Sequence, residues 1–190
     1  MRYWESVEAL LDDLPKLDTD GRRIRYLIAH HTWSPDKDSF DGERSVKGMV
    51  RYWRGRQKAS GWKNPPGGHF VVGPAGDIWA PFDDLALPLS ASSSDTFNHQ
   101  GVAVEIVGNF DEGRDELVNP QRHAVIGLFA GLMVQFGLSS ADVFFHRDAP
   151  AARKTCPGSG LDRSQFRMAI DAAKGWAFAQ LRVEPARRNR

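Results

Sequence analysis

Three short apolar segments, separated by helix-like stretches, constrain the fold of this chain most strongly. They cover residues 24–32, 102–107 and 142–146, and their length and composition are typical of buried β-strands. Two further apolar runs, residues 69–73 and 77–82, flank a Pro-Ala-Gly turn and predict a β-hairpin. Strands that alternate with helices predict an α/β fold, in which a mixed central β-sheet is flanked by helices in a single domain.

Four segments place apolar residues at helical intervals. The first precedes Pro15, the second is expected to start at a Ser45 cap, and the third to end at Gly137, a typical C-cap residue. The predicted helices cover residues 4–14, 45–59, 120–136 and 164–181. Residues 83–100 are expected to form a surface loop, and the basic tail 182–190 to be disordered.

Composition excludes several classes of protein. Of the 190 residues, 41% are hydrophobic and 26% charged, which is typical of a soluble globular protein. The formal net charge is +1, so there is no reason to expect a nucleic-acid partner. A single cysteine excludes an internal disulfide.

The sequence shows neither a signal peptide nor a membrane span. The first 14 residues carry four acidic side chains and no apolar run of seven or more. No segment approaches the roughly 20 apolar residues of a transmembrane helix. We therefore expect a product that is made in the cytoplasm and does not insert into membranes, and any action outside the cytoplasm would need another export route.

Two histidines and the lone cysteine form a candidate metal site. His30 and His146 each lie at the end of a predicted strand, and Cys156 follows ten residues after His146. Since neighbouring strand ends can converge, these side chains can meet at one ion. Two imidazoles and a thiolate suit zinc, and three protein ligands leave a fourth position open, as in catalytic sites. The alternative is that the cysteine is a small buried hydrophobe and the histidines are surface residues.

Three other polar residues lie in the predicted strands and helices but outside this ligand set. His31 follows a candidate ligand on a strand and would point to the opposite face, so we expect a core or supporting position. Glu105 interrupts the apolar strand 102–107, and a carboxylate there is costly unless it is paired. His123, in a predicted helix, is expected to be exposed.

Several motifs carry a resemblance to a known family. They occur in one order over about residues 24 to 175, and are Ile28-Ala29-His30-His31-Thr32, Gly61-Trp62, Gly68-His69-Phe70, Gly76-Asp77-Ile78, the run from Asn98 to Glu105, His146-Arg147-Asp148 and the run from Arg153 to Gly158. The chain resembles the zinc-dependent N-acetylmuramoyl-L-alanine amidases of type 2, which include phage endolysins, bacterial cell-wall amidases and animal peptidoglycan recognition proteins.

The resemblance implies a ligand set and a division of the chain. The zinc ligands would be His30, His146 and Cys156, and an active enzyme is implied because members that only recognise peptidoglycan lack a complete set. Residues 21–181 would form the catalytic domain, behind an N-terminal helical extension over residues 1–20.

The resemblance also assigns roles to two charged residues. Glu105 lies where some relatives carry a catalytic glutamate, and burial could raise its pKa toward the range of a general base. Lys154 matches a position near the open zinc site, where a cation would stabilise an oxyanion. The alternatives are a structural ion pair for Glu105 and a solvated loop charge for Lys154. Some family members carry a tyrosine where this chain has Gly68, which leaves more of the proton transfer to Glu105 and water.

Four further residues are candidates for substrate contacts. Trp62 could stack on a sugar, Asn98 and His99 could contact the muramyl or peptide part, and His69 is the fourth candidate. For each of them a structural role is the alternative.

The expected reaction is hydrolysis of the amide bond between N-acetylmuramic acid and L-alanine in peptidoglycan. The absence of a signal peptide favours an endolysin that reaches the wall after holin-type release. The alternatives are a cytoplasmic amidase that recycles anhydro-muropeptides and a non-catalytic peptidoglycan-binding module with a structural zinc. The basic tail could add weak electrostatic contact with an anionic envelope.

Overall fold

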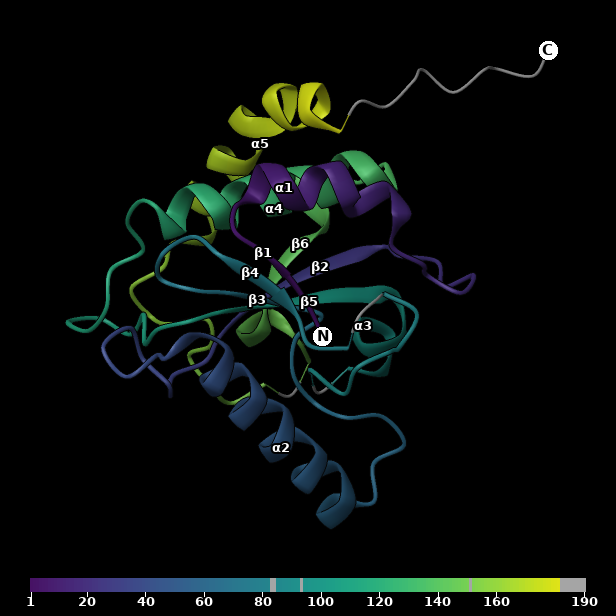
Figure 1. Ribbon diagram of the computed structural model, residues 1–190, viewed down its shortest axis with the longest axis vertical. Helices are drawn as coiled ribbons and strands as arrows, with labels where there is room; N and C mark the ends of the chain where they lie inside the picture. Colours follow the sequence, from purple (N-terminus) through teal and green to yellow (C-terminus); the bar gives the residue numbers. More distant parts are fainter. Residues whose placement is uncertain (83–84, 93, 151, 182–190) are drawn as a thin grey trace.

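The protein is built on one six-stranded mixed sheet. A computed structural model describes residues 1–82, 85–92, 94–150 and 152–181 (Figure 1). The strand order is β1-β4-β3-β5-β2-β6. Strands β3, β5, β2 and β6 run parallel; β4 pairs antiparallel with β3 at one edge, and β1 pairs antiparallel with β4. The strands are β1 Arg2–Trp4, β2 Tyr26–His31, β3 Phe70–Val72, β4 Ile78–Ala80, β5 Gly101–Ile106 and β6 Val143–Phe145. The expected α/β fold is confirmed.

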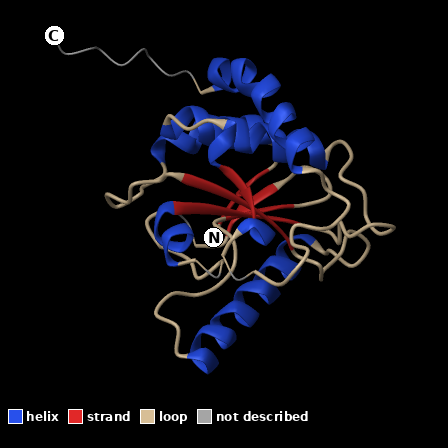
Figure 2. Ribbon diagram, turned by 180° about the vertical axis from the view of Figure 1, so that it is seen from behind, coloured by secondary structure: helices blue, strands red, loops and turns tan. Residues whose placement is uncertain are grey.

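Three helices cover one face of this sheet (Figures 1 and 2). They are α1 Val7–Asp13, α4 Gln121–Phe136 and α5 Arg163–Gln180. Alternate strand residues such as Leu27 and Val104 point into this layer and join one continuous apolar core. Helix α4 packs against both α5 and α1 and buries every residue from Ala124 to Met133, so it is apolar on nearly all sides.

The opposite face carries a single long helix, α2 Gly42–Ser60. Its residues Val46, Met49 and Trp53 pack against Val71, Trp79 and Val107, and these six residues form a separate small core. The C-terminal end of the helix points away from the sheet (Figure 1). A short helix, α3 Asp95–Gln100, leads directly into β5. Three 3-10 turns complete the structure, at Leu14–Lys16, Ser140–Asp142 and His146–Asp148.

The N-terminal segment differs from its prediction. Residues 2–4 form the edge strand β1, and the helix begins only at Val7, behind a Ser6 cap whose hydroxyl accepts a hydrogen bond from the Ala9 amide. A three-residue edge strand is too short to give a periodic signal, which is why the helix was predicted to start at Trp4. Because β1 pairs with β4 and Leu10 is fully buried, this segment is part of the sheet and core.

Other boundaries differ less. Helix α2 begins at Gly42 rather than Ser45, and the Ser45 hydroxyl accepts a hydrogen bond from the Asp41 amide. Helix α4 ends at Gly137 in the left-handed conformation, and the hairpin of β3 and β4 forms, both as predicted. The predicted loop 83–100 contains α3; its residues 83–84 and 93, like the tail 182–190, lie outside the described residues. Among the described helices, none is both long enough and apolar enough to span a bilayer.

Candidate metal centre

The structure brings His30, His146 and Cys156 together at the carboxyl ends of β2 and β6. One possible ligand atom from each residue lies within 4.8 Å of those of the other two. His30 Nδ1 is 3.7 Å from Cys156 Sγ, and the two imidazole centroids are 4.5 Å apart. Zinc bonds of about 2.3 Å to sulfur and about 2.05 Å to nitrogen, at a tetrahedral angle, place sulfur and nitrogen roughly 3.6 Å apart. The nitrogen and sulfur atoms of His30 and Cys156 therefore already have the spacing that a shared zinc ion requires, and His146 lies close enough to complete the set.

The surroundings of these side chains favour a bound cation. Burial lowers the pKa of His30 well below its usual range, and burial together with Lys154 lowers the pKa of His146 to about 4. Both imidazoles are therefore neutral at pH 7 and keep a lone pair for a metal. His30 Nε2 is buried without a hydrogen-bond partner among the described residues. Burial raises the pKa of the Cys156 thiol, so its thiolate needs a nearby positive ion.

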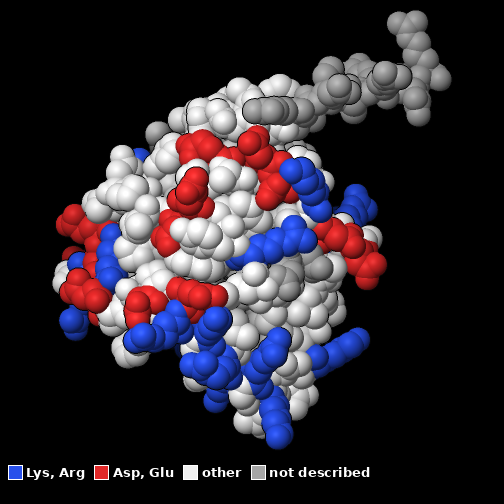
Figure 3. All heavy atoms as spheres, viewed as in Figure 1, with Lys and Arg blue, Asp and Glu red and all other residues white. Residues whose placement is uncertain are grey.

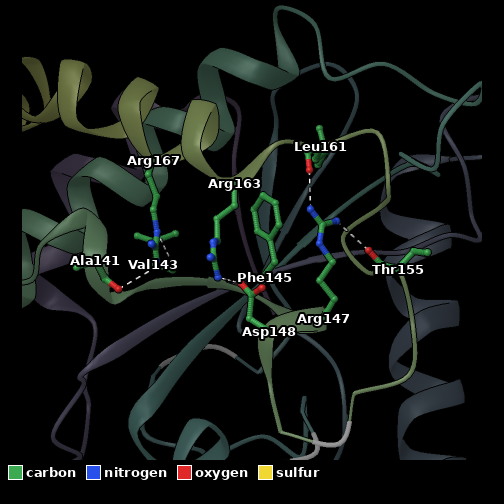
Figure 4. Close-up of polar contacts among 9 residues, drawn as sticks. All are labelled: Ala141, Val143, Phe145, Arg147, Asp148, Thr155, Leu161, Arg163 and Arg167. Atoms are coloured by element: carbon green, nitrogen blue, oxygen red, sulfur yellow. Dashed lines mark hydrogen bonds and ion pairs between the residues drawn. The ribbon is translucent and has the colours of Figure 1, made fainter.

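Arg147 holds the loop that carries Cys156 (Figure 4). Its amide donates to the Cys156 carbonyl at 2.8 Å, and its guanidinium donates to the carbonyl groups of Thr155, Gly158 and Leu161. These bonds tie the loop to the turn that begins at His146. The sequence motif contains Arg147, but its role was missed because its partners are backbone carbonyls that spacing does not reveal.

Asp148 fixes the same turn from the other side. Its carboxylate accepts a hydrogen bond from the Phe145 amide at 2.8 Å and pairs with Arg163 of α5 at 2.8 Å (Figure 4). The end of β6 is thereby tied to a helix of the main core.

Glu105 lies beside His30 in the same transverse row of the sheet. The two residues are register partners on β5 and β2, so their side chains share the α2 face. Glu105 is 9% exposed, and burial alone raises its pKa to about 8. No ion pair of this carboxylate occurs in the part of the chain that the structure describes, so the alternative of a structural ion pair finds no support.

Gly68 packs directly on Glu105. A Cβ atom at this position would lie 2.7 Å from Glu105 Cγ and 2.6 Å from the Phe70 carbonyl oxygen. Neither distance is compatible with a side chain. Position 68 must therefore be glycine as long as Glu105 keeps its place.

Lys154 and His31 line the outer part of the site. Lys154 is exposed, two residues before Cys156, and its charge lowers the pKa of His146. The His31 ring stacks on Phe110 and its Nδ1 accepts a hydrogen bond from the Phe110 amide at 3.3 Å. His31 is outside the metal cluster, but its own amide donates to Cys156 Sγ at 3.4 Å.

The geometry does not support a substrate contact by His69. This ring is 1% exposed; Nδ1 accepts from the Ala103 amide at 3.0 Å, and Nε2 lies 3.0 Å from the Leu87 carbonyl. Arg22, which the sequence reading missed, lies beside it and donates to the carbonyls of Leu85, Leu87, His99 and Gly101. His69 and Arg22 contact each other at 3.1 Å and bond to the surrounding backbone, which favours the structural role that the sequence left open for His69.

Asn98 and His99 also lie away from the metal cluster. Both belong to α3, before Gly101, whose register partner Tyr26 is four residues, or about 13 Å, before His30. The Asn98 amide is used by Ser92, from which its oxygen accepts and to which its nitrogen donates. The structure therefore does not bring these two candidates to the site.

Trp62 and His123 are both exposed. Trp62 is 42% exposed, lies just beyond the end of α2, and has the Arg56 guanidinium 5.9 Å from its ring centroid. His123 Nε2 is 2.9 Å from Glu8 on the other face of the molecule. His123 is thus exposed, as predicted, and Trp62 remains a candidate at the far end of α2.

Solved structures with this fold act on or bind peptidoglycan components according to their names. N-acetylmuramoyl-L-alanine amidase LysC from Clostridium intestinale is 22% identical, covering 82% of this chain and 89% of its own, with a TM-score of 0.57. A point mutant of Drosophila PGRP-LB in complex with tracheal cytotoxin is 18% identical, covering 84% and 85%, with a TM-score of 0.58. Peptidoglycan recognition protein-LE, also in complex with tracheal cytotoxin, is 14% identical, covering 75% and 79%, with a TM-score of 0.58. At these identities the likeness establishes the fold.

Family membership follows from the sequence itself. A family model described as N-acetylmuramoyl-L-alanine amidase matches residues 20–159, which include the whole metal cluster and Glu105. No match is found among curated proteins. The match covers most of the chain and also includes Lys154, so the chain belongs to the N-acetylmuramoyl-L-alanine amidase family.

Proposed function

We propose that this amidase binds one zinc ion through His30, His146 and Cys156 and cleaves the bond between N-acetylmuramic acid and L-alanine in polymeric peptidoglycan. The observation that carries the proposal is the cluster itself, in which three possible zinc ligands lie within 4.8 Å of one another, and His30 shares a row of the sheet with the buried carboxylate of Glu105. A bound zinc ion would polarise the amide carbonyl and lower the pKa of a water molecule to about 7.

Glu105 is the residue that moves protons in this proposal. Because its pKa is raised to about 8, its carboxyl group exchanges a proton close to neutral pH. It can accept a proton from the attacking water and then deliver it to the departing amine. Gly68 contributes by leaving the space that the Glu105 side chain occupies.

Lys154 stabilises the negative charge that develops on the carbonyl oxygen. It is exposed in the loop before Cys156, so its flexible side chain can reach a substrate at the site. Arg147 acts through the backbone of the same loop and keeps Cys156 in place.

The fold relatives support peptidoglycan as the substrate. LysC is named as an N-acetylmuramoyl-L-alanine amidase, and LysCS from the same organism as an endolysin amidase. PGRP-LE was solved with tracheal cytotoxin, described as monomeric diaminopimelic acid-type peptidoglycan. We therefore propose the endolysin role, with degradation of the bacterial cell wall, ahead of the recycling of soluble anhydro-muropeptides.

The test is digestion of purified sacculi in parallel with a soluble anhydro-muropeptide, with mass spectrometry of the products. We expect about one zinc per chain, release of stem peptides with free L-alanine amino termini, and solubilised sacculi. His30→Ala is the inactive control. Cleavage of the soluble substrate alone would replace the endolysin role by the recycling role, and no cleavage of either by the zinc-loaded protein would overturn the proposed activity.

A further inference from the structure

Helix α2 carries a straight row of cations on the face that points to solvent. The row consists of Arg44, Lys47, Arg51, Arg54 and Lys58, which we call the basic stripe, and all five are exposed. Intervals of three and four residues place them along one side of a helix. The residues that α2 buries, Val46, Met49 and Trp53, lie on the other side.

The stripe is a local concentration of charge in a nearly neutral chain. From Gly42 to Lys63 there are seven Lys and Arg residues and one carboxylate, whereas the whole chain has a formal net charge of +1. The same concentration is visible at the surface, where Lys and Arg gather over α2 (Figure 3). The rest of the chain, taken together, is therefore acidic, so an anionic partner is attracted to α2 rather than to the remainder as a whole.

Most of the stripe is free to bind. Arg44 pairs with Asp41 at 3.1 Å and Lys47 with Glu43 at 3.0 Å, both near the start of the helix. For Arg51, Arg54 and Lys58, no ion pair occurs among the described residues. A hollow of about 520 Å³ is lined by Arg44, Lys47 and Arg51, with the two carboxylates at its rim.

The shape of the stripe selects a linear partner. From Arg44 to Lys58 it is about 21 Å long and one side chain wide. A helix that lies in a membrane interface needs a free apolar face, but the apolar face of α2 is buried against the sheet, and no large apolar residue follows Trp53 within the helix. A wide duplex would also approach the acidic remainder of the surface.

We propose that the basic stripe binds a flexible phosphodiester polymer attached to the cell wall and thereby holds the enzyme on its substrate. This inference rests on the proposed action on walls. Helix α2 packs on the sheet face that carries His30 and Glu105, so a polymer bound along the stripe keeps the metal centre close to the wall. The exposed Tyr52 beside the stripe, at 65% exposure, offers further contact area.

The test compares two triple variants of the full chain. One removes the free part of the stripe, by Arg51→Gln, Arg54→Gln and Lys58→Gln. The control removes the same charge from scattered exposed positions, by Arg114→Gln, Arg122→Gln and Lys174→Gln. Circular dichroism and urea unfolding show that both are folded. The probe is poly(glycerol phosphate) of defined length, titrated at several salt concentrations.

We expect the stripe variant to bind this polymer about tenfold more weakly at low salt, with a salt dependence shallower by about two to three phosphate contacts. The control should bind as the wild type does. Equal losses in the two variants, or unchanged binding by the stripe variant, would overturn the proposal. Tighter binding to anionic phosphatidylglycerol vesicles or to a single-stranded oligonucleotide than to the polymer would overturn the choice of partner.

Hydrolysis separates this inference from the proposed function. The stripe variant should cleave a soluble muropeptide at the wild-type rate but digest polymer-bearing walls more slowly. That deficit should disappear on walls stripped of polymer with hydrofluoric acid. If the wild type cleaves neither substrate, the proposed function fails; if both variants digest all walls equally, only the stripe proposal fails.

Discussion

The two faces of the central sheet are built from alternate residues of the same strands, yet they serve different purposes. On the face covered by α1, α4 and α5, β2 and β5 contribute Leu27, Ala29, Val102 and Val104, all fully buried. On the α2 face the same strands contribute His30 and Glu105. The two-residue period of a β-strand therefore divides its side chains into a set that stabilises the fold and a set that carries the chemistry.

We expect the α2 face to contribute less to the stability of the fold because of this division. Its apolar core has six buried residues, three from α2 and three from the sheet and its edges. The same face holds imidazoles, a thiol and a carboxyl group whose charged forms are disfavoured by burial. Such groups cost free energy in the absence of a ligand. The comparison predicts that substitutions on one face change activity and those on the other change stability.

The largest effect is expected for Cys156→Ser on the α2 face. Loss of the thiolate should remove zinc and lower kcat/KM by about a thousandfold or more, since a Lewis acid contributes several kcal/mol and each 1.4 kcal/mol is tenfold. Serine fills nearly the same volume, so the metal-free protein should unfold within about 1 kcal/mol of the wild type. Zinc content, muropeptide turnover and urea unfolding in EDTA measure the three quantities. Retained activity in Cys156→Ser would contradict the assignment of the chemistry to the α2 face.

The converse substitution is Leu11→Ala on the opposite face. Leu11 is fully buried beside Gly131 in α4, so its truncation should lower the free energy of unfolding by about 2–5 kcal/mol. Turnover per folded molecule should stay within about twofold at low temperature. Met168→Ala, at a side chain of α5 that is 70% exposed, is the control and should cost less than about 0.5 kcal/mol. A large loss of turnover in folded Leu11→Ala would show that the two faces are coupled.

The raised pKa of Glu105 predicts that the stability of the protein depends on pH, an effect that the apolar face cannot produce. Its pKa is about 8 in the folded protein and near 4.5 when unfolded, so between these values the folded state holds the proton and the unfolded state has lost it. This contribution to stability is complete below pH 4.5 and is lost as the pH rises through 8. Metal-free wild type should therefore lose up to about 1.4 kcal/mol per pH unit relative to Glu105→Gln, measured by urea unfolding from pH 5 to 8. Parallel curves would show that Glu105 is not buried as described.

The smallest effect is expected for His99→Ala. This exposed side chain lies on α3, at the other end of β5 from the metal cluster. Because it is remote from the cluster, kcat and KM on a soluble muropeptide should both stay within about twofold of the wild type. Steady-state kinetics would check this, and a rise in KM alone would restore His99 as a substrate contact.

The sequence predicted what depends on periodicity and chain order. Helix α4 and its end at Gly137, the hairpin of β3 and β4, and the strands that end near His30 and His146 all follow from local patterns. The edge strand β1 did not, because three residues carry no period and pair only through β4.

Polar side chains that bond to distant backbone groups were beyond sequence reasoning. His69 and Asn98 lie in motifs of the family, but the structure uses His69 to bond the backbone of β5 and Asn98 to close a loop at Ser92. The roles of Arg22 and Arg147 could not be predicted for the same reason, because every residue has a backbone carbonyl and residue type does not show which ones accept these hydrogen bonds. His30, His146 and Cys156 could be proposed because the chemistry of their side chains is itself the signal.

The most direct test of the account is the zinc X-ray absorption spectrum of the zinc-loaded protein in solution. The account predicts one sulfur neighbour at about 2.3 Å, from Cys156, and nitrogen or oxygen neighbours at about 2.0–2.1 Å. The sulfur contribution should vanish in Cys156→Ser. A wild-type spectrum without sulfur would contradict the assignment of Cys156, and with it the metal centre on the α2 face.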